Sequence, residues 1–261
     1  MTGTRISGDG ASAPADLYLY AIGEGELELG DVRGLASAPL SLLRAGQLSG
    51  VVSAAPAGKL RPERRHLAAH QGVLRHIMAH TTVLPVGFGM VVPNESKALG
   101  MLLSEEETLL EQLESVRGRV EMSVRVVWDV PNIFQHFVER EPDLRGARDE
   151  MLRTGSHHSK VELGRLFERI IAHQREAASV RLQEVVAAVA DDICVDNPKS
   201  DSEVARVAAL VARERMGEFE ERVLEVAEGF DASYRFDLSG PWAPHSFSTM
   251  HLHVGSAAEA A

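Results

Sequence analysis

The sequence is poor in cysteine and in aromatic residues. Cys194 is the only cysteine among 261 residues, so the chain can form no intramolecular disulfide and contains no CxxC motif, as is typical of the reducing cytoplasm. Aromatic residues make up 5% of the chain, and only two of them are tryptophans. No apolar run approaches the roughly 18 residues of a membrane span, and the first fifteen residues lack the apolar core of a signal peptide. These absences favour a cytoplasmic protein.

Basic residues are also in the minority. The 27 lysines and arginines face 38 aspartates and glutamates, which gives a net charge of −11. Binding to nucleic acid or to an anionic membrane requires lysine and arginine to neutralise phosphates, so neither partner is expected. The acidic surface is interpreted as solvated and self-repelling. The hydrophobic content of 44% is ordinary, and the length suffices for one large or two smaller domains.

Short apolar or alternating runs predict β-strands at 17–22, 48–53, 119–129, 193–195 and 234–239. The clearest is 119–129, in which apolar and polar residues alternate. Residues 82–92 are also β-branched, but Pro85 bars a regular central strand, so an edge strand with a bulge or bend is expected there. The run 204–211 fits a helix or a buried strand, and its periodicity does not decide between them.

Amphipathic periodicity predicts helices at 62–80, 95–102, 104–116, 133 to a break at 141–143, 156–190, and 216–229. Leu67, Leu74 and Ile77 are expected to face inward from the first of these. Ser104 and Glu107 fit a capping box. The helix at 156–190 would be roughly 50 Å long, so it crosses a whole domain or forms half of a hairpin.

The order of these elements predicts an α+β protein with two domains. An N-terminal α+β domain is expected at 17–117. A ferredoxin-like α+β domain with the long helix at 156–190 is expected at 118–250. Residues 1–16 are expected to be disordered, and 251–261 to form a flexible tail.

A distinctive segment lies near the end of the chain, at 238–247. An alternating strand runs into Gly240 and Pro241, and Trp242 stands between that proline and Pro244, with Phe247 following. Glycine permits unusual backbone angles and proline fixes its own, so the strand is expected to exit into a stiff turn that carries the two aromatic residues. Such a turn indicates a docking shape, because it contains no nucleophile and no phosphate-binding loop.

Histidine pairs offer the main alternative chemistry. Two pairs, His66/His70 and His76/His80, each have the i, i+4 spacing of a helical zinc pair. The two pairs do not share one face of the helix, and neither has a third ligand nearby in the sequence. A polar helix face is the preferred interpretation. A second group, His251 and His253, lies near the tail. No catalytic, cofactor-binding or metal site is therefore predicted, and no cofactor.

Three stretches together resemble the gas vesicle GvpL/GvpF family. They are 18–22, then 70–74 followed by 83–89, and 238–247; the strand segment 121–124 is also similar. The resemblance covers about residues 17 to 250. The sequence differs from the usual family pattern at Gly87, where Arg or Lys is common, and at His245, where Tyr is common.

The resemblance implies a cytoplasmic accessory protein of gas vesicle formation without enzymatic activity. It implies contacts with the hydrophobic shell protein or other accessory proteins, two α+β domains, and a strand at 204–211. Its motifs make the following residues candidates for interaction or for a structural role: Leu84, Pro85, Phe88, Gly89, Gly240, Pro241, Trp242, Pro244 and Phe247.

Three alternatives stay open from the sequence. In the first, the two motifs serve only to join the domains within the chain. An enzyme could use histidines as acid/base groups or metal ligands in a ferredoxin-like cavity. A structural adaptor could be built on the long helix at 156–190 as a coiled coil.

Overall fold

The computed structural model describes residues 16–249, which form two compact units. Unit 1 comprises the chain up to Gly118 together with the residues from Ala243, and unit 2 comprises Arg119–Trp242. This division differs from the expected domains 17–117 and 118–250 in two respects, because Gly118 and the residues after Trp242 group with unit 1. The expectations for residues 1–15 and from 250 on, including His251 and His253, lie outside the described residues.

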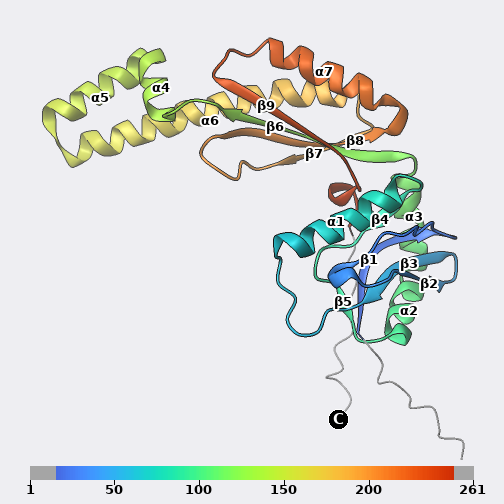
Figure 1. Ribbon diagram of the computed structural model, residues 1–261. Coiled ribbons are helices and arrows are strands. Elements are labelled where there is room, and N and C mark those ends of the chain that lie inside the picture. Colours follow the sequence, from blue (N-terminus) through green and yellow to red (C-terminus); the bar gives the residue numbers. More distant parts are fainter. Residues whose placement is uncertain (1–15, 250–261) are drawn as a thin grey trace, which may run out of the picture. The chain divides into compact units, whose positions relative to one another are not determined.

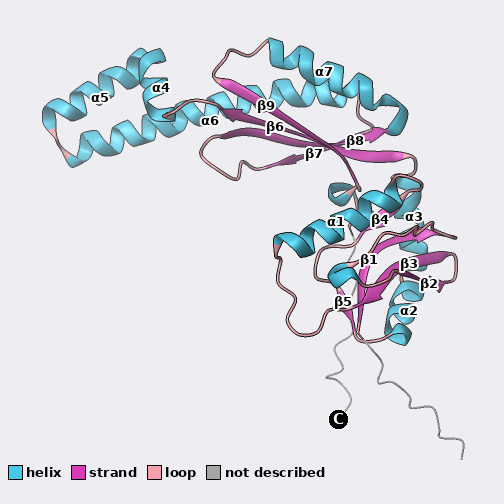
Figure 2. Ribbon diagram, in the orientation of Figure 1, coloured by secondary structure: helices cyan, strands magenta, loops and turns pink. Residues whose placement is uncertain are grey.

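Unit 1 is built on an antiparallel sheet (Figure 2). Its strands are β1 (Leu17–Glu24), β2 (Ser41–Ala45), β3 (Leu48–Ala54), β4 (Val83–Pro85) and β5 (Val91–Val92). The order is β2-β3-β1-β4, and β5 also pairs with β1. β1 is therefore central, and every residue from Tyr18 to Gly23 is buried.

The two faces of β1 are covered by different helices. These are α1 (Arg64–Met78), α2 (Glu95–Ser104) and α3 (Glu106–Ser115). Tyr18 and Tyr20 point to α1, where both rings contact His70. Leu19 points to the opposite face, where Gly50 leaves room for it and for Leu102 of α2. Unit 1 is thus a sheet with helices on both faces.

Unit 2 has a four-stranded antiparallel sheet in the order β7-β8-β6-β9. The strands are β6 (Arg119–Trp128), β7 (Asp192–Asp196), β8 (Glu203–Ala212) and β9 (Tyr234–Trp242). The alternation in β6 positions Val120, Met122, Val124 and Val126 in the core, and all four are at most 1% exposed. The ambiguous run 204–211 is the central strand β8.

The helices of unit 2 are α4 (Ile133–Arg140), α5 (Pro142–Thr154), α6 (His157–Ala187) and α7 (Met216–Glu228). α6 has 31 residues. Its C-terminal half packs on the sheet beside α7, whereas its N-terminal half extends beyond the sheet and pairs with α5 (Figure 1). The long helix therefore both crosses the sheet and forms half of a helical hairpin.

Several local expectations are wrong. Ser104 does not cap α3, because its hydroxyl donates to the carbonyl of Met101 and Glu105 stands at the N-cap. The residue Leu67 is 38% exposed; the buried face of α1 includes His70 and Val73 instead. The hairpin strand β2 was not predicted.

The edge strand expected at 82–92 is present in two pieces. β4 and β5 both pair with β1. The segment between β4 and β5 also forms two backbone hydrogen bonds with β1, from Val86 N to Tyr20 O and from Leu19 N to Met90 O. The interruption at 87–89 is thus a bulge in an edge strand, where a proline is tolerated.

Candidate interaction site

The first motif, at 84–89, is anchored inside unit 1. Leu84 and Pro85 lie in β4 and are buried. Phe88 is half-buried, and its ring contacts the rings of Tyr18 and His70 at centroid distances of 6.1 and 5.8 Å. Gly89 has a φ of +97°, which favours glycine, and its backbone N–H donates to the Tyr18 hydroxyl at 3.1 Å. The motif is therefore held by a buried polar cluster.

Tyr18, Tyr20 and His70 form that cluster. The Tyr18 hydroxyl lies 2.9 Å from His70 Nδ1, and the Tyr20 hydroxyl bonds Ser53 Oγ at 2.9 Å and accepts from the backbone N–H of Leu35. Burial raises the pKa of Tyr18 to about 12. Burial, assisted by the nearby His245, lowers the pKa of His70 to about 4, although a backbone contact at Val86 opposes this. At neutral pH Tyr18 and His70 are therefore uncharged and bonded to each other, and the ring of Tyr20 packs against both.

Gly240 and Pro241 lie within strand β9, and the expectation that the strand exits into a turn there is wrong. The φ of Gly240 is +141°, and a Cβ at this position would lie 2.7 Å from Met122 Sδ and 3.0 Å from the Glu121 carbonyl oxygen. The register of β9 against β6 shifts at this point, so glycine is required for a bulge. β9 is an edge strand, where the missing N–H of proline is tolerated.

Trp242 ends β9 and pairs with Glu121. Its side chain is half-buried, and its Nε1 lies 3.4 Å from Ser239 Oγ. Trp242 is thus the last residue of unit 2.

The chain then enters unit 1, where Pro244 is buried and Phe247 is half-buried in a short 3-10 helix at His245–Phe247. The closing motif is therefore divided between the two units. Gly240, Pro241 and Trp242 belong to one, while Pro244 and Phe247 belong to the other together with the 84–89 motif.

The histidine pairs on α1 are placed differently from one another. His70 is buried and bonded to Tyr18, whereas His66 Nδ1 lies 3.1 Å from the carbonyl oxygen of Arg61. His76 and His80 contact each other edge to face at 5.7 Å. Over residues 16–249, no group of three or more His, Cys, Asp or Glu side chains is arranged to hold a metal ion.

A cleft in unit 2 was not predicted from the sequence. Its volume is about 610 Å³, and it lies between α4 and α6. Ile133 and Phe134 of α4 face Phe167 and Ile171 of α6, and the two phenylalanine rings meet edge to face at 5.1 Å. We refer to this space as the α4–α6 cleft. The sequence indicated both apolar stripes, but periodicity does not show that Phe134 and Phe167 stay half-exposed.

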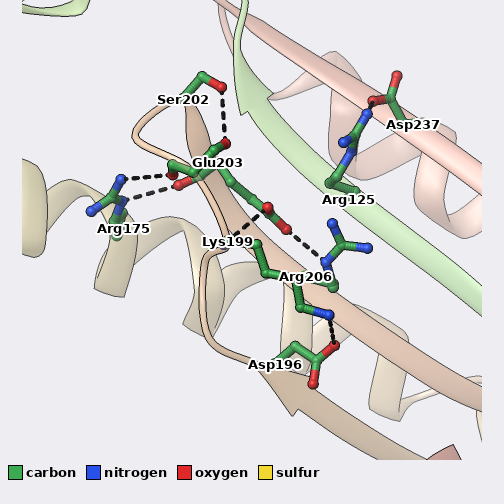
Figure 3. A network of polar contacts seen from close by, with 9 residues as sticks. Arg125, Arg175, Asp196, Lys199, Ser202, Glu203, Arg206 and Asp237 are labelled. Atoms are coloured by element: carbon green, nitrogen blue, oxygen red, sulfur yellow. Dashed lines mark hydrogen bonds and ion pairs between the residues drawn. The ribbon is translucent and has the colours of Figure 1, made fainter.

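The polar end of the α4–α6 cleft is held by Arg175 of α6. Its guanidinium donates to the carbonyl oxygens of Asp201 at 2.8 Å and Glu203 at 3.0 Å (Figure 3). The guanidinium also lies over the Trp128 ring, 5.4 Å from its centroid. These bonds hold the loop between β7 and β8 against α6. The loop contributes Asp201 to the cleft lining.

The same loop is braced by an ionic network on the sheet (Figure 3). The carboxylate of Glu203 is 3% exposed, accepts from Arg206 Nε at 2.7 Å, and accepts from the backbone N–H of Lys199 at 3.1 Å. On the neighbouring strands, Arg125 Nε donates to Asp237 at 3.1 Å. Burial raises the pKa of Glu203, but the bonds from Arg206 and Lys199 outweigh it, and the net pKa is lowered.

No helix in the described range 16–249 is both long and apolar enough to cross a membrane.

Comparison with known proteins relates the whole described chain to one family. The family model described as gas vesicle synthesis protein GvpL/GvpF matches residues 16–249. Gas vesicle protein F of Streptomyces sp. (strain CB03234) is 33% identical over 214 residues, which cover 80% of this chain and 87% of the relative. Gas vesicle protein L of the same strain is 28% identical over an alignment of 263 positions, which covers 88% of this chain and 92% of the relative.

A solved structure has the same fold. The crystal structure of the gas vesicle protein GvpF from Anabaena sp. PCC7120 matches with a TM-score of 0.78 and 26% identity. The match covers 90% of this chain and 99% of that chain, so it includes both units.

Proposed function

The chain belongs to the gas vesicle synthesis protein GvpL/GvpF family, and we propose that it is a non-catalytic accessory protein of gas vesicle formation. In this role it binds the hydrophobic shell protein, other accessory proteins, or both, in the cytoplasm and at the gas vesicle. The observation that carries the proposal is the match to the family along residues 16–249, supported by relatives named gas vesicle proteins F and L.

The proposal includes two α+β domains, with unit 2 as a ferredoxin-like domain enlarged by the α5–α6 hairpin. The order of elements in unit 2 supports this. Strand β6 is followed by helices, then by β7 and β8, then by α7 and β9, and the sheet order is β7-β8-β6-β9. That is the β-α-β-β-α-β arrangement of ferredoxin-like folds.

The placement of the ionisable groups favours binding over catalysis. The two side chains with the largest pKa shifts, Tyr18 and His70, are buried and bonded to one another. A catalytic acid or base must reach a substrate proton, and these two groups instead hold the 84–89 motif. The histidine-based enzyme considered from the sequence gains no support from this arrangement.

Deletion of the gene in a vesicle-forming host tests the proposal. We expect cells to lose flotation and mature vesicles by electron microscopy, and the wild-type gene to restore both. Normal flotation and normal vesicles in the deletion strain would overturn a role in vesicle formation.

Co-purification with the shell protein tests the candidate motif. Trp242→Ala is compared with Leu224→Ala, which removes an exposed apolar side chain of α7 elsewhere in unit 2. At equal unfolding midpoints, we expect only Trp242→Ala to reduce capture. Equal capture by both variants excludes a direct role for Trp242.

A further inference from the structure

We propose that the α4–α6 cleft of unit 2 binds one face of an amphipathic helix that carries basic residues beside its apolar stripe. This inference rests on the proposed function, since it names the kind of partner segment that an accessory protein of this family would hold and the place where it is held.

The walls of the cleft are apolar on both sides. Ile133 and Phe134 project from α4, and Phe167 and Ile171 project from α6. Phe134 and Phe167 are half-buried and contact each other, and the Phe167 ring also contacts the buried Phe137. An apolar occupant would remove these exposed ring surfaces from water, which is the main favourable term in such association.

The size of the cleft favours several side chains rather than one. Its volume of about 610 Å³ lies within the range, roughly 300–1,000 Å³, of sites that enclose drug-sized ligands. The cleft runs between two helices, and a groove of this kind is typically filled by side chains at i, i+3, i+4 and i+7 of a partner helix.

The charge at the rim determines the polar part of the occupant. Glu168 of α6 and Asp201 of the β7–β8 loop both line the cleft and are exposed. Within residues 16–249, neither side-chain carboxylate forms an ion pair. The one cationic group of the lining, Arg175, is already directed to backbone carbonyl oxygens. The rim is therefore acidic, and lysine or arginine complements it.

The polar wall is pre-organised, which reduces the entropy lost on binding. Arg175 fixes the loop that carries Asp201, and the Glu203 network fixes the same loop from the strand side (Figure 3). The backbone that carries Asp201, like that of Glu168 on α6, is consequently in place before the occupant binds.

Designed helical peptides provide the probe. The first peptide has leucines at i, i+3, i+4 and i+7 and lysines elsewhere; the second has glutamates in place of the lysines. Titration of each labelled peptide into the full-length protein is followed by fluorescence anisotropy. We expect the lysine peptide to bind at least about tenfold more tightly than the glutamate peptide at low salt, and less tightly as salt is added.

Two pairs of matched variants locate the binding. Ala172→Trp fills the cleft from α6, and Ala177→Trp adds the same bulk to an exposed position of α6 outside its lining. Glu168→Lys reverses the charge of the rim, and Glu176→Lys makes the same change outside the lining. We expect only Ala172→Trp and Glu168→Lys to weaken the lysine peptide, by about tenfold and about fivefold.

The charge reversal also provides a gain of affinity. Glu168→Lys is expected to tighten binding of the glutamate peptide, which a merely damaged fold would not do. Equal affinity of the lysine peptide for Ala172→Trp and Ala177→Trp, or for Glu168→Lys and Glu176→Lys, overturns the proposal.

Flotation separates this inference from the function on which it rests. If Ala172→Trp abolishes peptide binding and also prevents the deletion strain from regaining flotation, the cleft serves vesicle formation. Loss of peptide binding with full recovery of flotation refutes that link. Normal vesicles in the deletion strain itself refute the proposed function, whatever the peptides show.

Discussion

The hydroxyl of Tyr18 and Nδ1 of His70 lie 2.9 Å apart and join strand β1 to helix α1 in the core of unit 1. The same hydroxyl accepts from the backbone N–H of Gly89, so one oxygen atom serves both the helix and the bulged loop of the edge strand. Removal of this oxygen leaves the ring of the buried His70 and the backbone N–H of Gly89 without this bond.

We expect Tyr18→Phe to lower the free energy of unfolding of unit 1 by about 1–3 kcal/mol, because unsatisfied buried polar groups carry a desolvation penalty. Tyr234→Phe is the control. The ring of Tyr234 packs on Phe230, and loss of its hydroxyl is expected to change the free energy of unfolding by no more than about 0.5 kcal/mol. Urea unfolding of both variants is the measurement. Equal stability of the two would show that the Tyr18 bonds do not support the fold.

Acidification is expected to destabilise unit 1 through His70. The folded-state pKa of about 4 lies below the ordinary value of 6.5, so the unfolded chain takes up the proton first. The contribution is fully present above pH 6.5 and is lost as the pH falls through 4, by about 3 kcal/mol. His70→Gln cannot take up this proton. Denaturant unfolding between pH 7 and 4 should show a shallower decline for the variant; identical slopes would assign the effect to other groups.

Gly240→Ala is expected to destabilise unit 2 by about 2–3 kcal/mol, because the φ of +141° is strained for any residue with a Cβ and because Met122 Sδ occupies the space. Gly164→Ala is the control, for which the change in stability is expected to have the opposite sign. This glycine lies in α6 with open space around it, and alanine there should stabilise the helix by about 0.5–1 kcal/mol. Thermal or urea unfolding compares the two. A neutral Gly240→Ala would contradict the bulge geometry.

Glu203→Ala is expected to lower the free energy of unfolding of unit 2 by about 3 kcal/mol, because it leaves the largely buried Arg206 guanidinium and the Lys199 N–H without their acceptor. Glu162→Ala removes a carboxylate from an ion pair with Arg165 in which both side chains are exposed, and should cost less than about 1 kcal/mol. Urea unfolding measures both. Similar losses of stability in the two variants would show that the buried ion pair of Glu203 contributes no more to stability than the exposed pair of Glu162.

Periodicity predicted most of the elements because it records which side of each element is buried. The stripes of α6 and the alternation of β6 are clear for this reason, and the break between α4 and α5 follows from Pro142. The run at 204–211 was ambiguous because β8 is buried on both faces, which removes the alternation that identifies a strand.

Features that depend on distant partners could not be predicted in this way. Ser104 has the spacing of a capping residue, yet its hydroxyl finds a nearer acceptor at Met101. His70 has the spacing of a metal ligand, but the long-range contact with Tyr18 makes it a core residue. The short strand β2 had one available signal, Gly46 in a tight hairpin loop with a φ of +60°.

The candidate site shows the same limit. The α4–α6 cleft depends on how far two apolar stripes approach each other, and on the loop that Arg175 holds through backbone carbonyls. Neither property can be recognised from the spacing of residues in the sequence. The motif residues 240–242 were noticed because glycine and proline are conspicuous, but their position inside β9 followed only from the pairing with β6.

The discontinuity of unit 1 has a consequence for biosynthesis. All of unit 2 is contiguous in sequence, whereas unit 1 is completed by residues that follow Trp242, among them the buried Ala243 and Pro244. A ribosome therefore delivers every residue of unit 2 before it delivers the last part of unit 1. A chain that terminates at Trp242 therefore contains every residue of unit 2 but lacks the C-terminal part of unit 1, so a truncation there leaves only unit 1 incomplete.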